Sequence, residues 1–139
     1  MPDSLGFLDA VGGLPEQLEE AHRSARGALD RAALPRADDV DHVVVLGMGG
    51  SGIAGDVLAA AANATLPLPV VVLKQIRTPR FVGPRTLAFA VSYSGDTDET
   101  LQMARGALDA GARVVTVSRG GELAALAEEI GRASCRERV

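Results

Sequence analysis

Residues 43–52 read Val-Val-Val-Leu-Gly-Met-Gly-Gly-Ser-Gly, so an apolar run leads directly into a turn that is rich in glycine. A continuous apolar run is typical of a strand that is covered on both faces of a parallel sheet. Glycines in the turn let backbone N–H groups approach a ligand, and the positive end of a following helix favours a bound anion. This stretch therefore predicts a buried strand whose carboxyl end opens into an anion site.

A second stretch, 92–97, has the same setting but carries hydroxyl side chains: Ser-Tyr-Ser-Gly-Asp-Thr follows the apolar run 86–91. Its three hydroxyls, together with the backbone N–H groups that follow, can be aimed at one phosphate. Each hydroxyl alone is more often a turn residue or a helix N-cap. Three of them within six residues favour a phosphate site. The acidic side chains beside them, Asp96, Asp98 and Glu99, are expected to face solvent or other partners.

Strand-like and helix-like segments alternate around these two turns. Helices are predicted over 14–33, 54–62, 101–110 and 122–129, and strands over 43–46, 67–73, 86–91 and 113–117. Segment 35–41 is expected to be a linker, and 74–84 an extended crossover with at most a short helix. The alternation implies an α/β three-layer sandwich, in which a parallel sheet has helices on both faces. In a flavodoxin-like strand order, the first and third strands deliver both turns to one cleft.

Composition restricts the class of protein. The 139 residues have a net charge of −4 and only 3% aromatic residues, whereas a nucleic-acid partner would require a basic surface, usually with stacking aromatics. No apolar run is long enough for a membrane span, and the first residues lack the features of a signal peptide, so we expect a cytoplasmic protein. The single cysteine, Cys135, excludes an internal disulfide and argues against a metal cluster.

The first turn by itself fits several kinds of site. Gly47, Gly49 and Gly52 satisfy the G-x-G-x-x-G pattern of dinucleotide-binding domains, and two of them have the outer spacing of a nucleotide P-loop. The P-loop is excluded because residues 53–54, Ile-Ala, stand where Lys followed by Ser or Thr is required. An NAD site lacks its acidic residue at the end of the second strand. An NADP site, with Lys74 toward the extra phosphate, and a glycine turn without a ligand stay open as alternatives.

Taken together, the two turns resemble the sugar isomerase (SIS) fold, and within it the bifunctional phosphoglucose/phosphomannose isomerases. The resemblance is carried by 44–56, Val-Val-Leu-Gly-Met-Gly-Gly-Ser-Gly-Ile-Ala-Gly-Asp, and by 91–101, Val-Ser-Tyr-Ser-Gly-Asp-Thr-Asp-Glu-Thr-Leu. It spans most of 14–129, and 14–18, Leu-Pro-Glu-Gln-Leu, is its weaker part. The sequence departs from the family at Asp96, where Asn is more usual.

The resemblance implies a site and a reaction. The sugar end of a phosphorylated hexose would contact Gly49, Gly50 and Ser51, and its phosphate would be held by Ser92, Ser94 and Thr97. The implied reaction interconverts glucose 6-phosphate, and mannose 6-phosphate, with fructose 6-phosphate. This aldose–ketose isomerisation uses acid and base groups that move a proton through an enediol, so we expect no metal and no other cofactor.

The resemblance also implies that the chain is part of a larger enzyme. We expect a helical extension and linker over 1–40, an incomplete first SIS domain over 41–129, and a non-native tail over 130–139. The tail resembles one reading frame of a sequencing adapter, and a native basic tail is the alternative. In the family that the sequence resembles, the catalytic Glu, His and Lys lie in the second half of a longer chain. No catalytic residue is therefore assigned here, and the fragment is expected to be inactive. Both His22 and His42 are expected to have surface roles.

Three further expectations follow. The full-length protein is expected to be a homodimer, as in the family that it resembles. The strand at 113–117 is expected to lie at the edge of the sheet, because no further strand follows the last predicted helix. The second function that the sequence allows is a non-catalytic, sugar-phosphate-sensing regulator, although 14–34 is predicted as one long helix without the internal turn of a helix-turn-helix.

Overall fold

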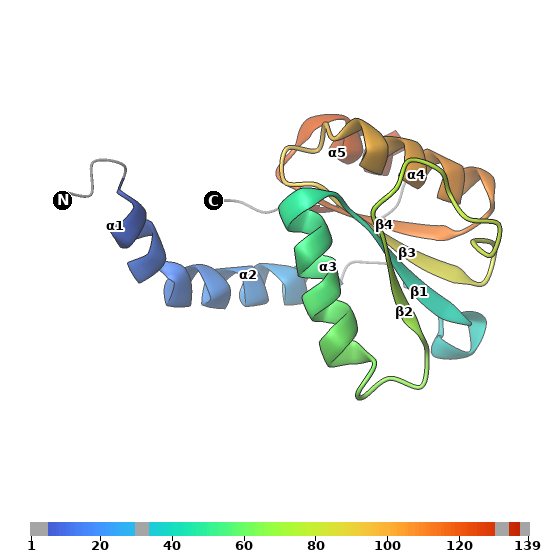
Figure 1. The fold of residues 1–139 in the computed structure, drawn as a ribbon, viewed down its shortest axis with the longest axis horizontal. Helices are drawn as coiled ribbons and strands as arrows, with labels where there is room; N and C mark the ends of the chain where they lie inside the picture. Colours follow the sequence, from blue (N-terminus) through green and yellow to red (C-terminus); the bar gives the residue numbers. More distant parts are fainter. Residues whose placement is uncertain (1–5, 30–33, 130–133, 137–139) are drawn as a thin grey trace.

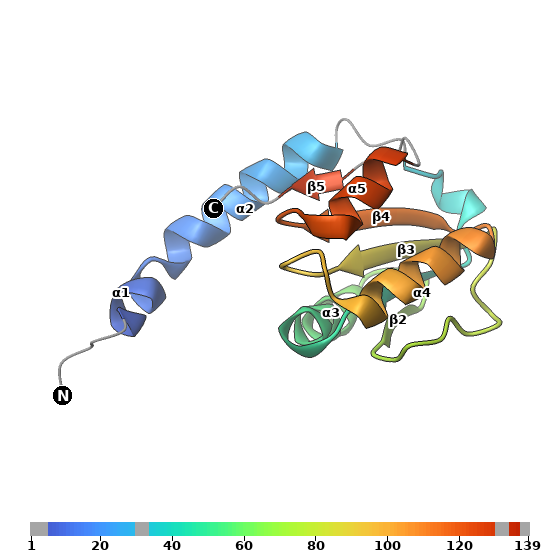
Figure 2. The same cartoon turned by 90° about the horizontal axis from the view of Figure 1, so that it is seen from above.

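The computed structural model describes residues 6–29, 34–129 and 134–136. Figure 1 and Figure 2 show a central sheet with helices on both faces, and two N-terminal helices that extend away from it. The strands are β1 (His42–Leu46), β2 (Val70–Leu73), β3 (Thr86–Val91), β4 (Arg113–Ser118) and β5 (Ser134–Arg136). The helices are α1 (Phe7–Gly12), α2 (Leu14–Leu29), α3 (Gly49–Ala62), α4 (Asp98–Asp109) and α5 (Gly121–Glu129), with a short 3-10 helix over Ala37–Asp39.

The strands are all parallel and lie in the order β2-β1-β3-β4-β5. The direction of winding reverses between β1 and β3, which confirms the predicted flavodoxin-like order. These two strands are in register, with Leu46 opposite Ala90. The turn after β1 and the turn after β3 therefore leave the sheet side by side.

The two faces of the sheet are covered by different helices, which confirms the three-layer sandwich (Figure 2). One face carries Val44, Leu46 and Ala88, which pack with buried side chains of α4 and α5 such as Met103 and Leu123. The other face carries residues such as Val43, Val45 and Val70, against which α3 packs. Burial of these apolar side chains on both faces explains why the strands read as continuous apolar runs rather than as alternating patterns.

The first helix of the core begins earlier than the sequence predicted. We expected residues 47–52 to form a loop before a helix at 54, whereas α3 begins at Gly49 and includes most of this segment. Glycine is a poor helix former in isolation, so the pattern favoured a loop. The structure uses glycine here for close packing: a Cβ on Gly55 would lie only 3.0 Å from the side chains of Val45 and Val72.

The other boundaries differ less, with two exceptions. Helix α1 was not predicted, and α2 ends at Leu29, so the expected continuation over 30–33 lies outside the described residues. The expectation that β4 lies at the edge of the sheet is wrong, because β5 pairs with it and places Cys135 opposite Val117. An uncovered strand edge presents unpaired N–H and C=O groups, and residues 134–136 pair with them. Segment 74–84 contains no regular helix, as expected.

The amino ends of the strands carry a polar cluster on the side opposite the site. The carboxylate of Asp41 forms an ion pair with Arg85 at 2.7 Å, and the guanidinium also donates to the backbone oxygen of Asp38. The Nε2 atom of His42 lies 2.9 Å from the hydroxyl of Thr86, and its ring packs edge-on against Phe81. His42 thus lies at the amino ends of the strands, away from the turns after β1 and β3. None of the described helices is long and apolar enough to cross a membrane.

We expect the Asp41–Arg85 pair to make a small contribution to stability that acid removes. The hydrogen bond from Arg85 holds the pKa of Asp41 below its ordinary value. A carboxyl group with a lowered pKa stabilises the fold fully when the pH is above its ordinary pKa. This contribution is lost as the pH falls through the lowered pKa of the folded state. Urea denaturation at several pH values between about pH 7 and pH 2 should therefore show that the free energies of unfolding of wild type and Asp41→Asn differ most near neutral pH. A difference that stays constant with pH would contradict this assignment.

Candidate functional site

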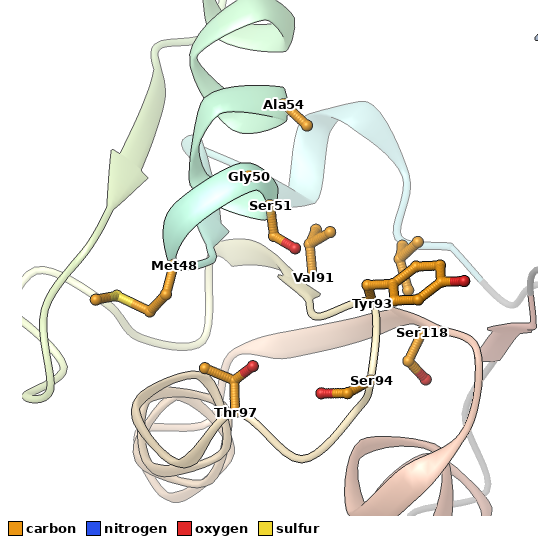
Figure 3. A pocket seen from close by; sticks show the side chains of 10 residues that line it. Met48, Gly50, Ser51, Ala54, Val91, Tyr93, Ser94, Thr97 and Ser118 are labelled. Carbon is orange, nitrogen blue, oxygen red and sulfur yellow. The ribbon is translucent and has the colours of Figure 1, made fainter. Parts of the chain in front are cut away.

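A cleft with a volume of about 480 Å³ opens at the carboxyl edge of the sheet, among the ends of β1, β3 and β4 (Figure 3). The residues that line it are uncharged: Met48, Gly50, Ser51, Ala54, Val91, Tyr93, Ser94, Thr97, Val117 and Ser118. Four of the six predicted site residues, Gly50, Ser51, Ser94 and Thr97, are among them. The structure thus brings the two predicted turns to one cleft.

The first turn forms the N-terminus of α3. The backbone N–H of Gly52 donates to the oxygen of Met48 at 3.1 Å, which is the first hydrogen bond of this helix. The N–H groups of residues 49–51 therefore have no acceptor within the helix, and no side chain caps it. A Cβ on Gly52 would lie 2.9 Å from both the Gly47 oxygen and the side chain of Lys74, so this turn requires glycine.

The second turn is held together by Ser92, which is only 2% exposed. Its hydroxyl forms a hydrogen bond of 2.8 Å with the hydroxyl of Thr97 and accepts one of 3.1 Å from the N–H of Gly95. Ser92 is thus not among the lining residues but lies beneath the turn. By contrast, Ser94 is exposed, lines the cleft, and accepts a hydrogen bond from the N–H of Asp96.

The second turn also leads into a helix N-terminus that no side chain caps. Thr97 is the N-cap residue of α4, but its hydroxyl is bonded to Ser92 and does not cap the helix. The first hydrogen bond of α4 runs from the N–H of Leu101 to the oxygen of Thr97, which leaves the N–H groups of residues 98–100 without an acceptor in the helix. The cleft therefore lies where the N-termini of α3 and α4 meet, and both favour an anion.

The turn after β4 supports the turn after β3. The N–H of Leu123 donates to the oxygen of Gly95 at 2.9 Å, and the N–H of Glu122 donates to a carboxylate oxygen of Asp96 at 2.9 Å. Asp96 therefore caps α5, where a negative charge is favourable, and does not line the cleft. Gly95 has a φ of +82°, and a Cβ on it would lie 1.8 Å from the Gly120 oxygen. The two turns touch too closely for any side chain at that position.

Six residues that line the cleft were not among the predicted site residues: Met48, Ala54, Val91, Tyr93, Val117 and Ser118. Ser118 ends β4 and is 3% exposed, and its hydroxyl has no hydrogen-bond partner among the described residues. The position of Ser118 in the sequence could have predicted it as a site residue, because it follows the apolar run of β4 as Ser92 follows that of β3. Gly49, which was predicted, belongs to the first turn but is not among the lining residues.

The charges near the first turn are already paired. The Lys74 ammonium group forms an ion pair with Asp56 on α3, and neither residue lines the cleft. Lys74 is thus not free for the extra phosphate of NADP without breaking this pair. Within the described residues, no group of three or more His, Cys, Asp or Glu side chains could hold a metal ion.

No family model matches the chain, whereas curated proteins and solved structures are similar to it. A bifunctional phosphoglucose/phosphomannose isomerase from Caldicellulosiruptor bescii is 35% identical over 125 residues, which are 90% of this chain and 36% of the relative. The chain spans 26% to 36% of the length of these curated relatives.

Two examples illustrate the solved structures that share the fold. Tagatose-6-phosphate ketose/aldose isomerase from Escherichia coli matches with a TM-score of 0.64 and 16% identity, over 97% of this chain and 36% of that protein. The Vibrio vulnificus NanR protein, complexed with ManNAc-6P, matches with a TM-score of 0.62 and 21% identity, over 88% of this chain and 49% of that protein. At such identities the likeness shows the SIS-like fold, which agrees with the predicted fold class.

Proposed function

We propose that this chain, which is homologous to part of the bifunctional phosphoglucose/phosphomannose isomerases, is the sugar-phosphate-binding part of an aldose–ketose isomerase. Its substrates would be glucose 6-phosphate and mannose 6-phosphate, each interconverted with fructose 6-phosphate. The observation that carries the proposal is the meeting of two uncapped helix N-termini with three hydroxyl side chains, those of Ser51, Ser94 and Thr97, at one cleft. Convergent donors of this kind suit a phosphate ester.

In this proposal the phosphate lies against the turn after β3. The hydroxyl of Ser94 and the N-terminus of α4 at Thr97 face the cleft and would hold it, and Ser92 acts by fixing Gly95 and Thr97 beneath the turn. The sugar would lie toward the N-terminus of α3. Direct contacts of Ser92 with the phosphate, and of Gly49, Gly50 and Ser51 with the sugar, stay predictions.

Catalysis would come from the part of the homologous enzymes that this chain does not span. Isomerisation needs a base that moves a proton between neighbouring carbons and an acid or base that opens the ring. No carboxylate, histidine or lysine among the residues that the structure describes lines the cleft. We therefore propose that the 139 residues bind substrate without converting it. The homodimer that the resemblance implies belongs to this proposal for the full-length protein.

A regulator that senses a sugar phosphate is the second candidate. It is favoured by the structural match to NanR, which is bound to a phosphorylated sugar. The described N-terminal region argues for the enzyme, because α2 is one uninterrupted helix of 16 residues and α1 has only 6. A helix-turn-helix needs two helices of adequate length at a sharp angle. Isomerase assays on the full-length protein would separate the two functions.

We expect glucose 6-phosphate to stabilise the 139-residue chain, whereas glucose and NADPH do not. A ligand that binds only the folded state adds about 2.7 kcal/mol of stability at one hundred times its Kd. Thermal unfolding with each compound measures this directly, and glucose is the control for the phosphate group. A larger shift with NADPH would favour the dinucleotide alternative. Turnover of glucose 6-phosphate at an enzyme-like rate would contradict the assignment of catalysis to the absent part.

A further inference from the structure

A cationic side chain lies at the rim of the cleft, next to its aromatic wall. The guanidinium of Arg119 donates a hydrogen bond of 3.3 Å to the hydroxyl of Tyr93, and its carbon Cζ lies 5.9 Å from the centroid of the ring. The backbone N–H of Arg119 also donates to the backbone oxygen of Tyr93 at 3.1 Å. Tyr93 lines the cleft and is 58% exposed (Figure 3). Arg119 follows directly on Ser118, another lining residue.

The charge of Arg119 is not neutralised by a carboxylate in the described part of the chain. The ion pairs there involve Arg23, Lys74, Arg85 and Arg105, and Arg119 contacts the neutral phenol of Tyr93 instead. Since the walls of the cleft are uncharged and the protein carries a net charge of −4, a local cation matters for attracting an anion. A guanidinium also presents several donors in a plane that matches a phosphate.

We infer that Arg119 is a further ligand-binding residue of this cleft, which supplies the positive charge for the phosphate ester, and that Tyr93 is the positioning residue that holds it at the rim. The inference rests on the proposed function, because it assumes that the cleft binds a sugar phosphate. Arg119 is exposed, so its side chain is free to turn from the phenol toward a ligand in the cleft.

The test compares Arg119, which directly follows β4, with Arg113, which is exposed at the opposite end of that strand. Isothermal titration with glucose 6-phosphate should show that Arg119→Gln weakens binding roughly 10-fold, because a hydrogen bond between charged groups is lost. Arg113→Gln removes the same charge from the protein and should leave the Kd within about twofold. Arg119→Lys should recover part of the loss. The dependence of log Kd on salt should become shallower only in Arg119→Gln.

The Tyr93→Phe variant tests the positioning role. It keeps the ring but removes the hydroxyl that holds the guanidinium, so we expect binding to weaken about threefold while the salt dependence persists. Equal Kd values and salt slopes for Arg119→Gln and Arg113→Gln would overturn the role of Arg119, and wild-type affinity in Tyr93→Phe would overturn that of Tyr93. If the wild-type chain binds no glucose 6-phosphate at all, the proposed function fails first, which separates the two failures.

Discussion

Replacing Gly95 with alanine is expected to destabilise the protein by about 3 kcal/mol or more and to abolish binding at the cleft. Gly95 has a φ of +82°, which side chains of L-residues adopt only with strain. The added Cβ would also lie 1.8 Å from the oxygen of Gly120 and 2.7 Å from its carbonyl carbon, so the backbone itself would have to move. This movement would break the hydrogen bond from Leu123 to Gly95 and separate the two turns.

Gly120 provides a matched control for this substitution. It is the other glycine of the same contact, but a Cβ on it would meet no atom within 4 Å, and its φ is not in the left-handed region. The free energy of unfolding of Gly120→Ala, measured in urea, should therefore stay within about 0.5 kcal/mol of wild type. If Gly95→Ala were as stable as Gly120→Ala, the close packing of the two turns would not be needed for the fold.

The double variant Ser51→Ala with Ser94→Ala is expected to weaken the binding of glucose 6-phosphate roughly 50-fold or more, with little change in stability. Ser94 would donate to the charged phosphate, and the loss of such a hydrogen bond weakens binding roughly 10-fold or more, whereas Ser51 would bond to the uncharged sugar, where the loss is about fivefold. Both side chains line the cleft. Ser94 is exposed, so water can replace its hydroxyl where it accepts from Asp96.

Thr65→Ala is the control for the loss of a hydroxyl. Thr65 follows the C-terminal end of α3, and its hydroxyl donates to the backbone of the last turn of that helix. Ser51 lies in the first turn of the same helix, at the cleft. Titration should show wild-type affinity for Thr65→Ala. Wild-type affinity in the double variant would refute the role proposed for these two hydroxyls. A loss of stability equal to the loss of binding energy would show that they support the fold instead.

The order of the elements was predictable because it depends on local chemistry. An apolar run such as 43–46 followed by glycines marks a buried strand and a turn wherever it occurs, and the strand order follows from the alternation of strands and helices. The placement of both turns at one cleft was likewise predicted and is confirmed. The start of α3 was predicted too late, because glycine has a low helix propensity and this propensity does not take into account the sheet against which the helix packs.

The roles of the hydroxyls were harder to separate. Ser92 and Ser94 are equivalent as residue types, but the structure places one beneath the turn and the other in the cleft. The buried positions of β3 alternate from Thr86 through Ala88 and Ala90, and Ser92 continues that alternation. Burial of Ser92 was thus accessible from the period of the strand, whereas the exposure of Ser94 depends on how the turn bends after the strand ends.

The amino-acid sequence alone determined which residues form strands and turns, and which of the turns carry hydroxyls, since these properties depend on neighbours within a few positions. Only the tertiary structure decided what those turns contact. Asp96 caps a helix whose first residues lie 26 positions further along the chain, and Arg119 reaches Tyr93 over the same separation. Such contacts depend on the pairing of β3 with β4, which sets these two turns against each other and aims Asp96 away from the cleft. The predicted strand order places β3 beside β4, but no local pattern encodes how the turns after these two strands bend toward each other, because that depends on packing across the whole sheet.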